Sequence, residues 1–267
     1  MATRIETLSD DDLTRARASV APLSRDIGSA KRDAGNGALV VAWLGDMHAH
    51  STQDLAESTD TFRTHINSEA NFELALTEVL ALDPAPDVLV LGGDLTNWNT
   101  PAAYDVFRRI LDRHWPARGA PPVLPIRGNH DQMLIKPDSL SFHSAWQRLR
   151  RPDFPEPADV GDGHYYDVSL GGWRFVAWDP GLNTLTELQR RWIRQRLAPE
   201  RPSEPTVVLT HVPVLPCGNW VDRFALTDPA VLEALDACPH VKLVMSGHTH
   251  KSAAWRYRGK IHAIFPA

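Results

Sequence analysis

The sequence predicts a layered α/β fold with a buried, partly parallel β-sheet. Short apolar runs rich in Val and Leu recur along the chain, and several intervals between them carry helical spacing with start signals. Strands that alternate with helices in this way are typical of a parallel sheet covered on both faces. One pair of runs is joined directly by Gly171-Gly172, which predicts a hairpin and makes the sheet mixed.

The predicted strands follow from their length and from their β-branched and aromatic content. They span residues 38–44, 87–91, 123–126, 173–178, 206–210 and 241–245, with residues 164–170 as the other arm of the hairpin.

The predicted helices follow from their start signals. Thr100-Pro101 offers an N-cap and a proline at the first helical position. Residues 184–187 have the spacing of a capping box, and Thr227-Asp228-Pro229 opens a third helix. Residues 69–82 form a fourth, with Phe72 and Leu76 among its apolar positions.

Composition argues against several classes of partner. The formal net charge of −5 leaves no basic surface for nucleic acid and no polybasic patch for a membrane. No apolar stretch reaches the roughly 18 residues of a spanning helix, and the first residues lack the layout of a signal peptide. The 2 cysteines, Cys217 and Cys238, are too few for a disulfide framework, although one bridge stays open. We therefore expect a cytoplasmic protein.

The chain divides unevenly. Residues 1–37 are polar and close on Gly35-Asn36-Gly37, so we expect a lead-in, either a weak helix or a flexible segment, rather than a domain. Residues 38–267 carry the whole pattern of strands and helices and are expected to form one domain.

Five of the predicted strands are followed at once by side chains that can bind a metal ion. They are Asp46 and His48, then Asp94, then Asn129 with His130, then His211, and last His248 with His250. Ligands of open α/β sheets bind outside the carboxyl ends of the strands, so we expect these side chains to converge there.

These residue types indicate two metal ions with oxygen and nitrogen ligands. No cysteine follows a strand, which disfavours Cu(I) and iron–sulfur clusters, whereas Asp, Asn and His suit Mn, Fe, Zn or Co. His248 and His250 lie two residues apart, so on extended backbone each ring can serve a different ion. A carboxylate such as Asp94 can bridge two ions about 3.5–4 Å apart.

The net charge of such a centre predicts the charge of the ligand that it binds. Two divalent ions outweigh the carboxylates of Asp46 and Asp94, and a bridging hydroxide still leaves net positive charge. Phosphate is the natural anion to complete it.

The spacing of these residues resembles the calcineurin-like metallophosphoesterases. Their motifs read D-x-H, GD, GNH[DE], an isolated H, and GHxH, and this sequence carries all of them in that order. They appear as Asp46-Met47-His48, Gly93-Asp94, Gly128-Asn129-His130-Asp131, His211 and Gly247-His248-Thr249-His250. The resemblance covers residues 38–267 and implies two mixed β-sheets sandwiched together and flanked by helices.

The resemblance also implies a role for each motif residue. One metal would be held by Asp46, His48, Asp94 and His250, and the other by Asp94, Asn129, His211 and His248. A bridging water, acidified toward a pKa near ~7, would attack phosphorus in line with the leaving oxygen. His130 is not a ligand in the family but contacts the phosphate, which makes it the catalytic candidate. Asn97, Arg127 and Trp220 are expected to contact the substrate.

Within this superfamily the sequence is more similar to bacterial class III cyclic-nucleotide phosphodiesterases and related glycerophosphodiesterases. The similarity lies in the stretch from His211-Val212-Pro213 to Trp220-Val221-Asp222-Arg223. It implies a small anionic phosphodiester as substrate, with no membrane partner and with a homo-oligomer left open.

Some positions depart from the family pattern. Purple acid phosphatases carry a tyrosine where this chain has Asn97, so an Fe(III)–tyrosinate site is not expected. Residues 49–68 are polar and are expected to form a long loop over the site. Family members generally continue beyond the position of Ala267, so an edge of the second sheet is expected to be missing or supplied by another subunit.

Four other functions remain open on this sequence. A phosphomonoesterase or a nucleotide pyrophosphatase could use the same centre, and a non-catalytic scaffold could keep the fold. The scaffold is disfavoured because all the expected ligand positions are filled, and a DNA-repair nuclease is disfavoured by the acidic balance. The remaining histidines are expected on the surface or in packing: His50, His65, His114, His143, His164, His240 and His262.

Overall fold

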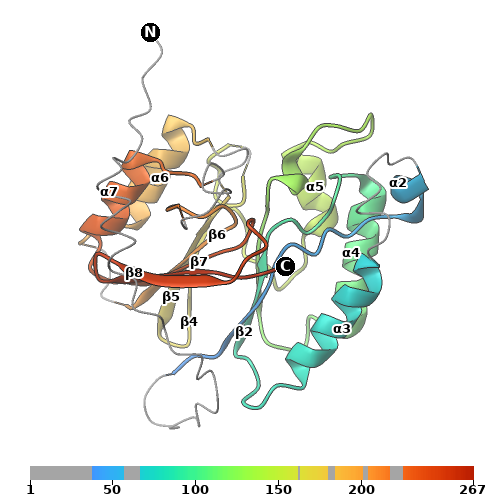
Figure 1. Cartoon of the computed structure of the whole chain (residues 1–267), viewed down its shortest axis with the longest axis horizontal. Helices are drawn as coiled ribbons and strands as arrows, with labels where there is room; N and C mark the ends of the chain where they lie inside the picture. Colours follow the sequence, from blue (N-terminus) through green and yellow to red (C-terminus); the bar gives the residue numbers. More distant parts are fainter. Residues whose placement is uncertain (1–37, 57–66, 162, 180–183, 201–203, 217–224) are drawn as a thin grey trace.

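The computed structural model describes residues 38–56, 67–161, 163–179, 184–200, 204–216 and 225–267. In this part the chain forms a sandwich of two β-sheets with helices on both outer faces, which confirms the predicted fold class (Figure 1).

The first sheet has three strands in the order β1-β2-β3, all parallel among the described residues. Its strands are β1 (Val41–Leu44), β2 (Val88–Gly92) and β3 (Val123–Ile126). The expectation that both sheets are mixed is therefore wrong for this one. The chain returns through helices after β1 and β2, and such crossovers produce parallel neighbours.

The second sheet is mixed and has six strands in the order β4-β5-β6-β7-β9-β8. The strands are β4 (Tyr166–Leu170), β5 (Trp173–Trp178), β6 (Thr206–Thr210), β7 (Val241–Ser246), β8 (Ala253–Tyr257) and β9 (Lys260–Ile264). β4 and β5 form the predicted antiparallel hairpin.

Strands β8 and β9 were not among the strands predicted from apolar runs. They form a second antiparallel hairpin, turned by Arg258 and Gly259 at φ 46° and 79°. Two residues with positive φ are the signature of a tight hairpin turn. β8 includes Arg256 and β9 includes Lys260, so neither strand reads as a continuous apolar run.

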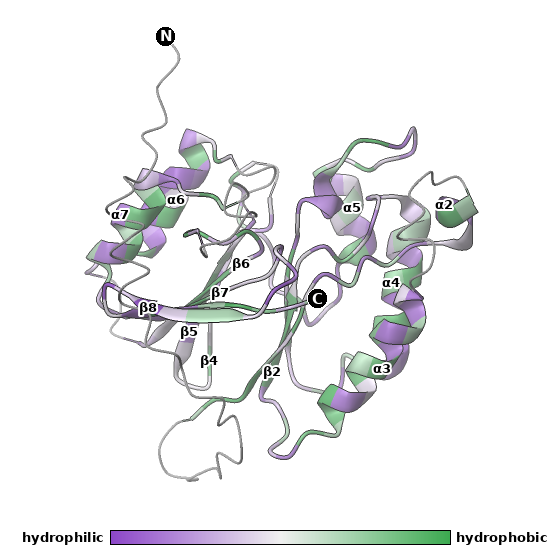
Figure 2. Cartoon of the chain, viewed as in Figure 1, coloured by the Kyte–Doolittle hydropathy of each residue, from purple (hydrophilic) through white to green (hydrophobic). Residues whose placement is uncertain are grey.

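Helices cover the outer face of each sheet. The first sheet is covered by α3 (Ser68–Leu80), α4 (Pro101–His114) and α5 (Phe142–Leu149). The second sheet is covered by α6 (Glu187–Arg196) and α7 (Pro229–Ala237). Figure 2 shows polar residues alternating with apolar ones around these helices, as expected when only one face of each is buried.

A separate apolar layer joins the two sheets. Val88, Val90 and Ile126 of the first sheet belong to the same buried cluster as Phe175 and Leu209 of the second. This layer fixes the sheets face to face, and it brings the ends of their parallel strands to a common rim.

The helix caps match the sequence signals closely, with one shift. Thr100 caps α4 by accepting from Ala103 N at 3.2 Å, and Asp228 caps α7. The capping box of α6 uses Thr186 and Gln189, two residues beyond the predicted position, because these two side chains satisfy each other's backbone N–H groups.

Helix α3 buries Phe72 and Leu76 but leaves several other apolar residues outside. Leu74 is 57% exposed and Leu80 is 42% exposed. The apolar spacing located this helix correctly, but its buried side is narrower than its composition suggests.

The segment expected as a long loop over the site contains the short helix α2 (Thr52–Ala56), whereas residues 57–66 lie outside the described residues. The predicted lead-in over residues 1–37 also lies outside them. None of the helices among the described residues combines the length and apolarity that a bilayer crossing requires.

Candidate metal centre

The candidate ligands lie on loops that follow the carboxyl ends of β1, β2, β3, β6 and β7. The loops after β1 and β2 are joined by backbone hydrogen bonds, from Asp46 N to Gly93 O and from His48 N to Asp94 O, both 2.9 Å. Gly247 N likewise donates to His211 O at 2.9 Å, which joins the loops after β7 and β6. Backbone pairing therefore sets the spacing of the side chains at the rim.

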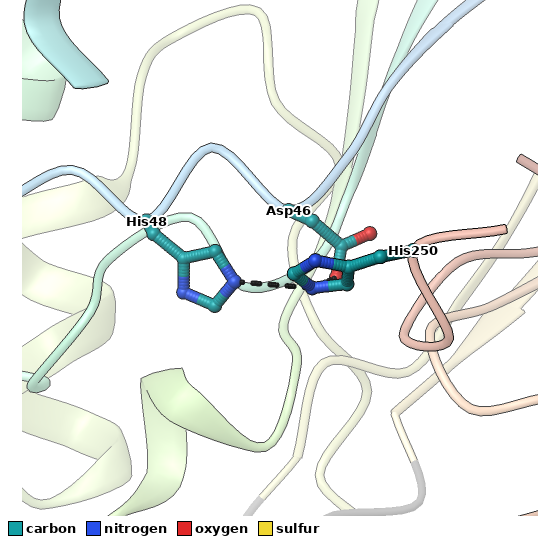
Figure 3. Close-up of side chains that lie close together, drawn as sticks. All are labelled: Asp46, His48 and His250. Carbon is teal, nitrogen blue, oxygen red and sulfur yellow. Dashed lines mark hydrogen bonds and ion pairs between the residues drawn. The ribbon is translucent and has the colours of Figure 1, made fainter. Parts of the chain in front are cut away.

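Three groups of side chains at this rim have the spacing of metal ligands. They are Asp46 with His48 and His250, then His48 with Asp94 and His130, and then Asp94 with His211 and His248. Figure 3 shows the first group: Asp46 and His48 come from the loop after β1, and His250 reaches them from the loop after β7. The structure thus brings together residues separated by about two hundred positions, as the motif order predicts.

Asp94 lies between the groups. Its Oδ1 is 3.4 Å from His211 Nε2, and its Oδ2 is 3.7 Å from His48 Nε2. On the other side, His250 Nε2 is 3.2 Å from Asp46 Oδ1 and 3.4 Å from His48 Nε2. A carboxylate in this central position has the geometry of a bridging ligand.

Backbone carbonyls orient two of the rings. His211 Nδ1 lies 2.8 Å from Gly92 O, and His130 Nδ1 lies 2.8 Å from Asn97 O. A carbonyl can only accept, so each Nδ1 carries a proton and each Nε2 faces the rim. Such an arrangement is typical of a histidine prepared for a metal or a phosphate.

The candidate ligands occupy strained backbone. Asp46, His48, Asp94, His248 and His250 all have positive φ, between 48° and 68°. Non-glycine residues rarely adopt this region, and such residues cluster at functional sites.

Close packing at the rim also requires glycine. A Cβ on Gly128 would lie 2.1 Å from Asp94 Oδ1, and one on Gly93 would lie 2.5 Å from His211 Nδ1. Gly93 additionally has φ 92°. These glycines let backbone approach two candidate ligands closely.

The ionisation of the rim favours a bound cation. Burial lowers the pKa of both His48 and His248 to about 4, so both rings are neutral and can act as ligands. Burial also opposes charge on His211, but the charge and hydrogen bond of Asp94, followed by Asp46, outweigh it and raise that pKa to about 10. Burial opposes charge on Asp94 too, yet His211 holds the pKa of Asp94 well below its usual range. The buried carboxylates thus draw positive charge toward the rim.

One buried atom tests whether the residues fit a metal. Asn129 Oδ1 has no hydrogen-bond partner among the described residues. A buried acceptor without a partner is costly, and a cation would satisfy it. Together with the Asp and His donors, this fits oxygen- and nitrogen-liganded metals.

The three residues expected to contact the substrate do not belong to the groups with metal-ligand spacing. Asn97 is buried and meets His130 through its backbone carbonyl. Arg127 is only 2% exposed and donates from Nη2 to Asp131 O, while its guanidinium lies over the Phe142 ring. Trp220 lies outside the described residues.

Asp131 has a larger structural role than the sequence indicates. Its carboxylate accepts from Leu95 N at 2.9 Å, Thr96 N at 2.8 Å and Gly128 N at 2.9 Å, and also from Thr96 Oγ1. It therefore ties the loop that carries Asp94 to the loop that carries Asn129 and His130. Its place in the GNHD motif was the only signal available.

Comparison with known proteins agrees with this geometry. The family model for calcineurin-like phosphoesterases matches residues 39–252. The chain belongs to the calcineurin-like phosphoesterase family.

Curated relatives within this family include phosphodiesterases. A probable cyclic nucleotide phosphodiesterase of Synechococcus sp. is 33% identical over 63% of this chain and 59% of its own length. A glycerophosphodiester phosphodiesterase of Enterobacter lignolyticus is 27% identical over 72% of this chain and 66% of its own length. The chain therefore spans about three fifths to two thirds of these relatives.

Among solved structures, a dimetal phosphatase from Danio rerio superposes with a TM-score of 0.66 at 17% identity. The superposition covers 85% of this chain and 87% of that one, so the two share a fold.

Proposed function

We propose that this protein hydrolyses small anionic phosphodiesters at a centre of two metal ions on the rim. The observation that carries the proposal is the convergence of Asp and His side chains from four separate loops around Asp94. The relatives named as phosphodiesterases support the choice of reaction.

The ligand sets we propose extend two of the three groups at the rim. Asp46, His48 and His250 would hold one ion and His211, Asn129 and His248 the other, with Asp94 shared between them. Bound ions of Mn, Fe, Zn or Co would acidify water and neutralise phosphate charge. Residues 38–267 would form the domain that builds this centre.

His130 is the proposed catalytic residue. Its backbone N–H donates to Asp94 Oδ1 at 2.8 Å, and its Nε2 lies 4.0 Å from Asp94 Oδ2. Asn97 O accepts from Nδ1 and so orients the ring, and the protonated ring would use Nε2 to steady the phosphate or to give a proton to the leaving oxygen. Arg127 lies within the fold, and we propose that it holds the loop of His130 rather than the substrate.

Turnover of bis(p-nitrophenyl) phosphate tests the proposal. We expect chelation to abolish turnover and Mn²⁺ to restore it, and His130→Ala to lower kcat while leaving the metal content unchanged. Absence of turnover with every divalent metal tried would end the proposal.

A phosphomonoesterase or a nucleotide pyrophosphatase on the same centre is the alternative. Rates on p-nitrophenyl phosphate and on its bis ester, measured on one preparation, separate mono- from diesterase. A scaffold without activity would bind metal and turn over neither.

A further inference from the structure

A cavity of about 590 Å³ opens beside the candidate metal centre. It lies between the end of β1, helix α3 and the last residues of the described chain, and Asp46, His48 and His250 form part of its wall. Small-molecule sites commonly have volumes of roughly 300–1,000 Å³, so the cavity is large enough for an organic group bound next to the metals.

Most of the cavity wall is apolar. Trp43, Met47 and Phe72 contribute to it, together with Leu74 and Ala75 of α3. Leu74 is 57% exposed although it belongs to a helix that packs against the sheet. When an apolar ligand covers an exposed leucine on a cavity wall, the burial of its apolar surface stabilises the complex.

Apart from histidines at the end near the candidate metal centre, the wall carries no basic side chain. Of the described residues that line the cavity, none is Lys or Arg, and Glu78 adds an acid. A second phosphate or a carboxylate bound away from those histidines would meet no countercharge. A polyol would leave its hydroxyl groups against apolar wall.

One end of the cavity offers fixed polar groups. His50 Nδ1 lies 3.0 Å from both His48 O and Ser68 Oγ, and all three residues belong to the wall. His48 is also a candidate ligand, so the polar end lies next to the metals and the apolar wall leads away from them.

We propose that this cavity binds the organic substituent of the phosphoester, and that the substituent is uncharged, apolar and of aryl size. The inference rests on the proposed function, because the phosphate must be held by the metals. It identifies Leu74 and Ala75 as specificity-determining residues. It disfavours glycerol esters, and it disfavours diphosphates whose second phosphate would enter this cavity.

Two phosphonates that resist hydrolysis test the inference by equilibrium binding. Methylphosphonate and phenylphosphonate share the anionic group and differ in the substituent, and calorimetry on the Mn²⁺-loaded chain gives both dissociation constants. At a pH where both are dianions, we expect phenylphosphonate to bind at least ~10-fold more tightly, from burial of its ring.

Variants on α3 locate the effect. Ala75→Phe fills the cavity and is expected to bring the ratio of the two affinities close to one. Leu74→Ser removes an apolar contact at an exposed position and is expected to lower the ratio about threefold. The matched controls are Ala70→Phe and Leu80→Ser, on the same helix but outside the cavity wall, and both should keep the parent ratio.

Each outcome decides a different point. If methylphosphonate fails to bind the metal-loaded chain, the proposed function falls and the inference falls with it. If both phosphonates bind with equal affinity, the metal centre stands and the apolar subsite is wrong. If phenylphosphonate is preferred but neither Ala75→Phe nor Leu74→Ser changes the preference, the substituent binds elsewhere.

Discussion

The metal rim and the surroundings of Arg151 are both buried and charged, yet they are built differently. Arg151 donates from Nε and Nη2 to the two oxygens of Asp153 at 2.8 and 2.9 Å, and from Nη1 to Trp115 O at 2.8 Å. At the rim, Asn129 Oδ1 is buried without a hydrogen-bond partner among the described residues.

The difference separates charge that stabilises the fold from charge kept for a ligand. Each guanidinium nitrogen of Arg151 has a partner within the fold, and Asp112 adds a second carboxylate 3.4 Å from Nη1. The rim combines a buried acceptor without a partner, Asn129 Oδ1, with left-handed backbone, which costs stability unless a ligand binds. Satisfaction of polar atoms, rather than burial alone, marks the functional region.

The largest expected effect is at the centre of the rim. Asp94→Asn keeps the shape and still accepts from His130 N, but it removes the bridging charge. We expect turnover to fall by roughly 10³-fold or more and metal content to drop, because the substituted amide is a weak bridge. Turnover and elemental analysis measure the two effects, with Asp105→Asn on the exposed face of α4 as the control. Normal metal content in Asp94→Asn would contradict the central role.

Arg151→Met should lower stability but leave metal binding and turnover unchanged. It leaves Asp153 and Trp115 O without their partner, so the free energy of unfolding should fall by about 3 kcal/mol in urea titration. Metal affinity and kcat of the folded fraction should match those of the parent. A loss of metal affinity here would erase the distinction between the two regions.

Asp131→Asn should affect both properties, because Asp131 joins the loops of the rim. The amide keeps one acceptor oxygen and presents an N–H₂ toward backbone donors, including Gly128 N. We expect unfolding to be easier by about 2 kcal/mol and Mn²⁺ affinity to fall roughly tenfold. Calorimetric Mn²⁺ binding on fully folded protein separates the two. Unchanged affinity would limit Asp131 to a structural role.

The smallest effect concerns His262 of β9, which packs against Trp255 at 5.8 Å between ring centroids. Burial, followed by the charge of Lys260, lowers its pKa from 6.5 to about 4. Between pH 4 and pH 6.5 the unfolded chain therefore binds a proton at His262 that the folded chain does not bind. The contribution of His262 to the free energy of unfolding is complete above pH ~6.5. It declines as the pH falls toward 4, by at most about 1.4 kcal/mol per pH unit.

His262→Gln tests this dependence. Urea titrations at pH 7 and at pH ~5.5 should show about 1 kcal/mol less loss on acidification than in the parent. His143→Gln, at an exposed position, should behave as the parent does. An equal loss in His262→Gln would show that another group titrates.

The sequence alone determined the layered fold, the strands that read as apolar runs and the candidate ligands that follow them. These signals are local: an apolar run predicts a buried strand, and Thr100-Pro101 predicts where α4 begins. It missed β8 and β9, whose charged residues interrupt the apolar pattern.

Only the tertiary structure decided which side chains meet and which face solvent. The parallel pairing of β1 with β2, and the apolar layer between the sheets, bring Asp46 and Asp94 to one rim with His250. The same packing buries Arg127 and leaves Leu74 exposed on the wall of a cavity. Contacts between residues distant in the chain depend on how the layers pack, and no local pattern of residues encodes that packing.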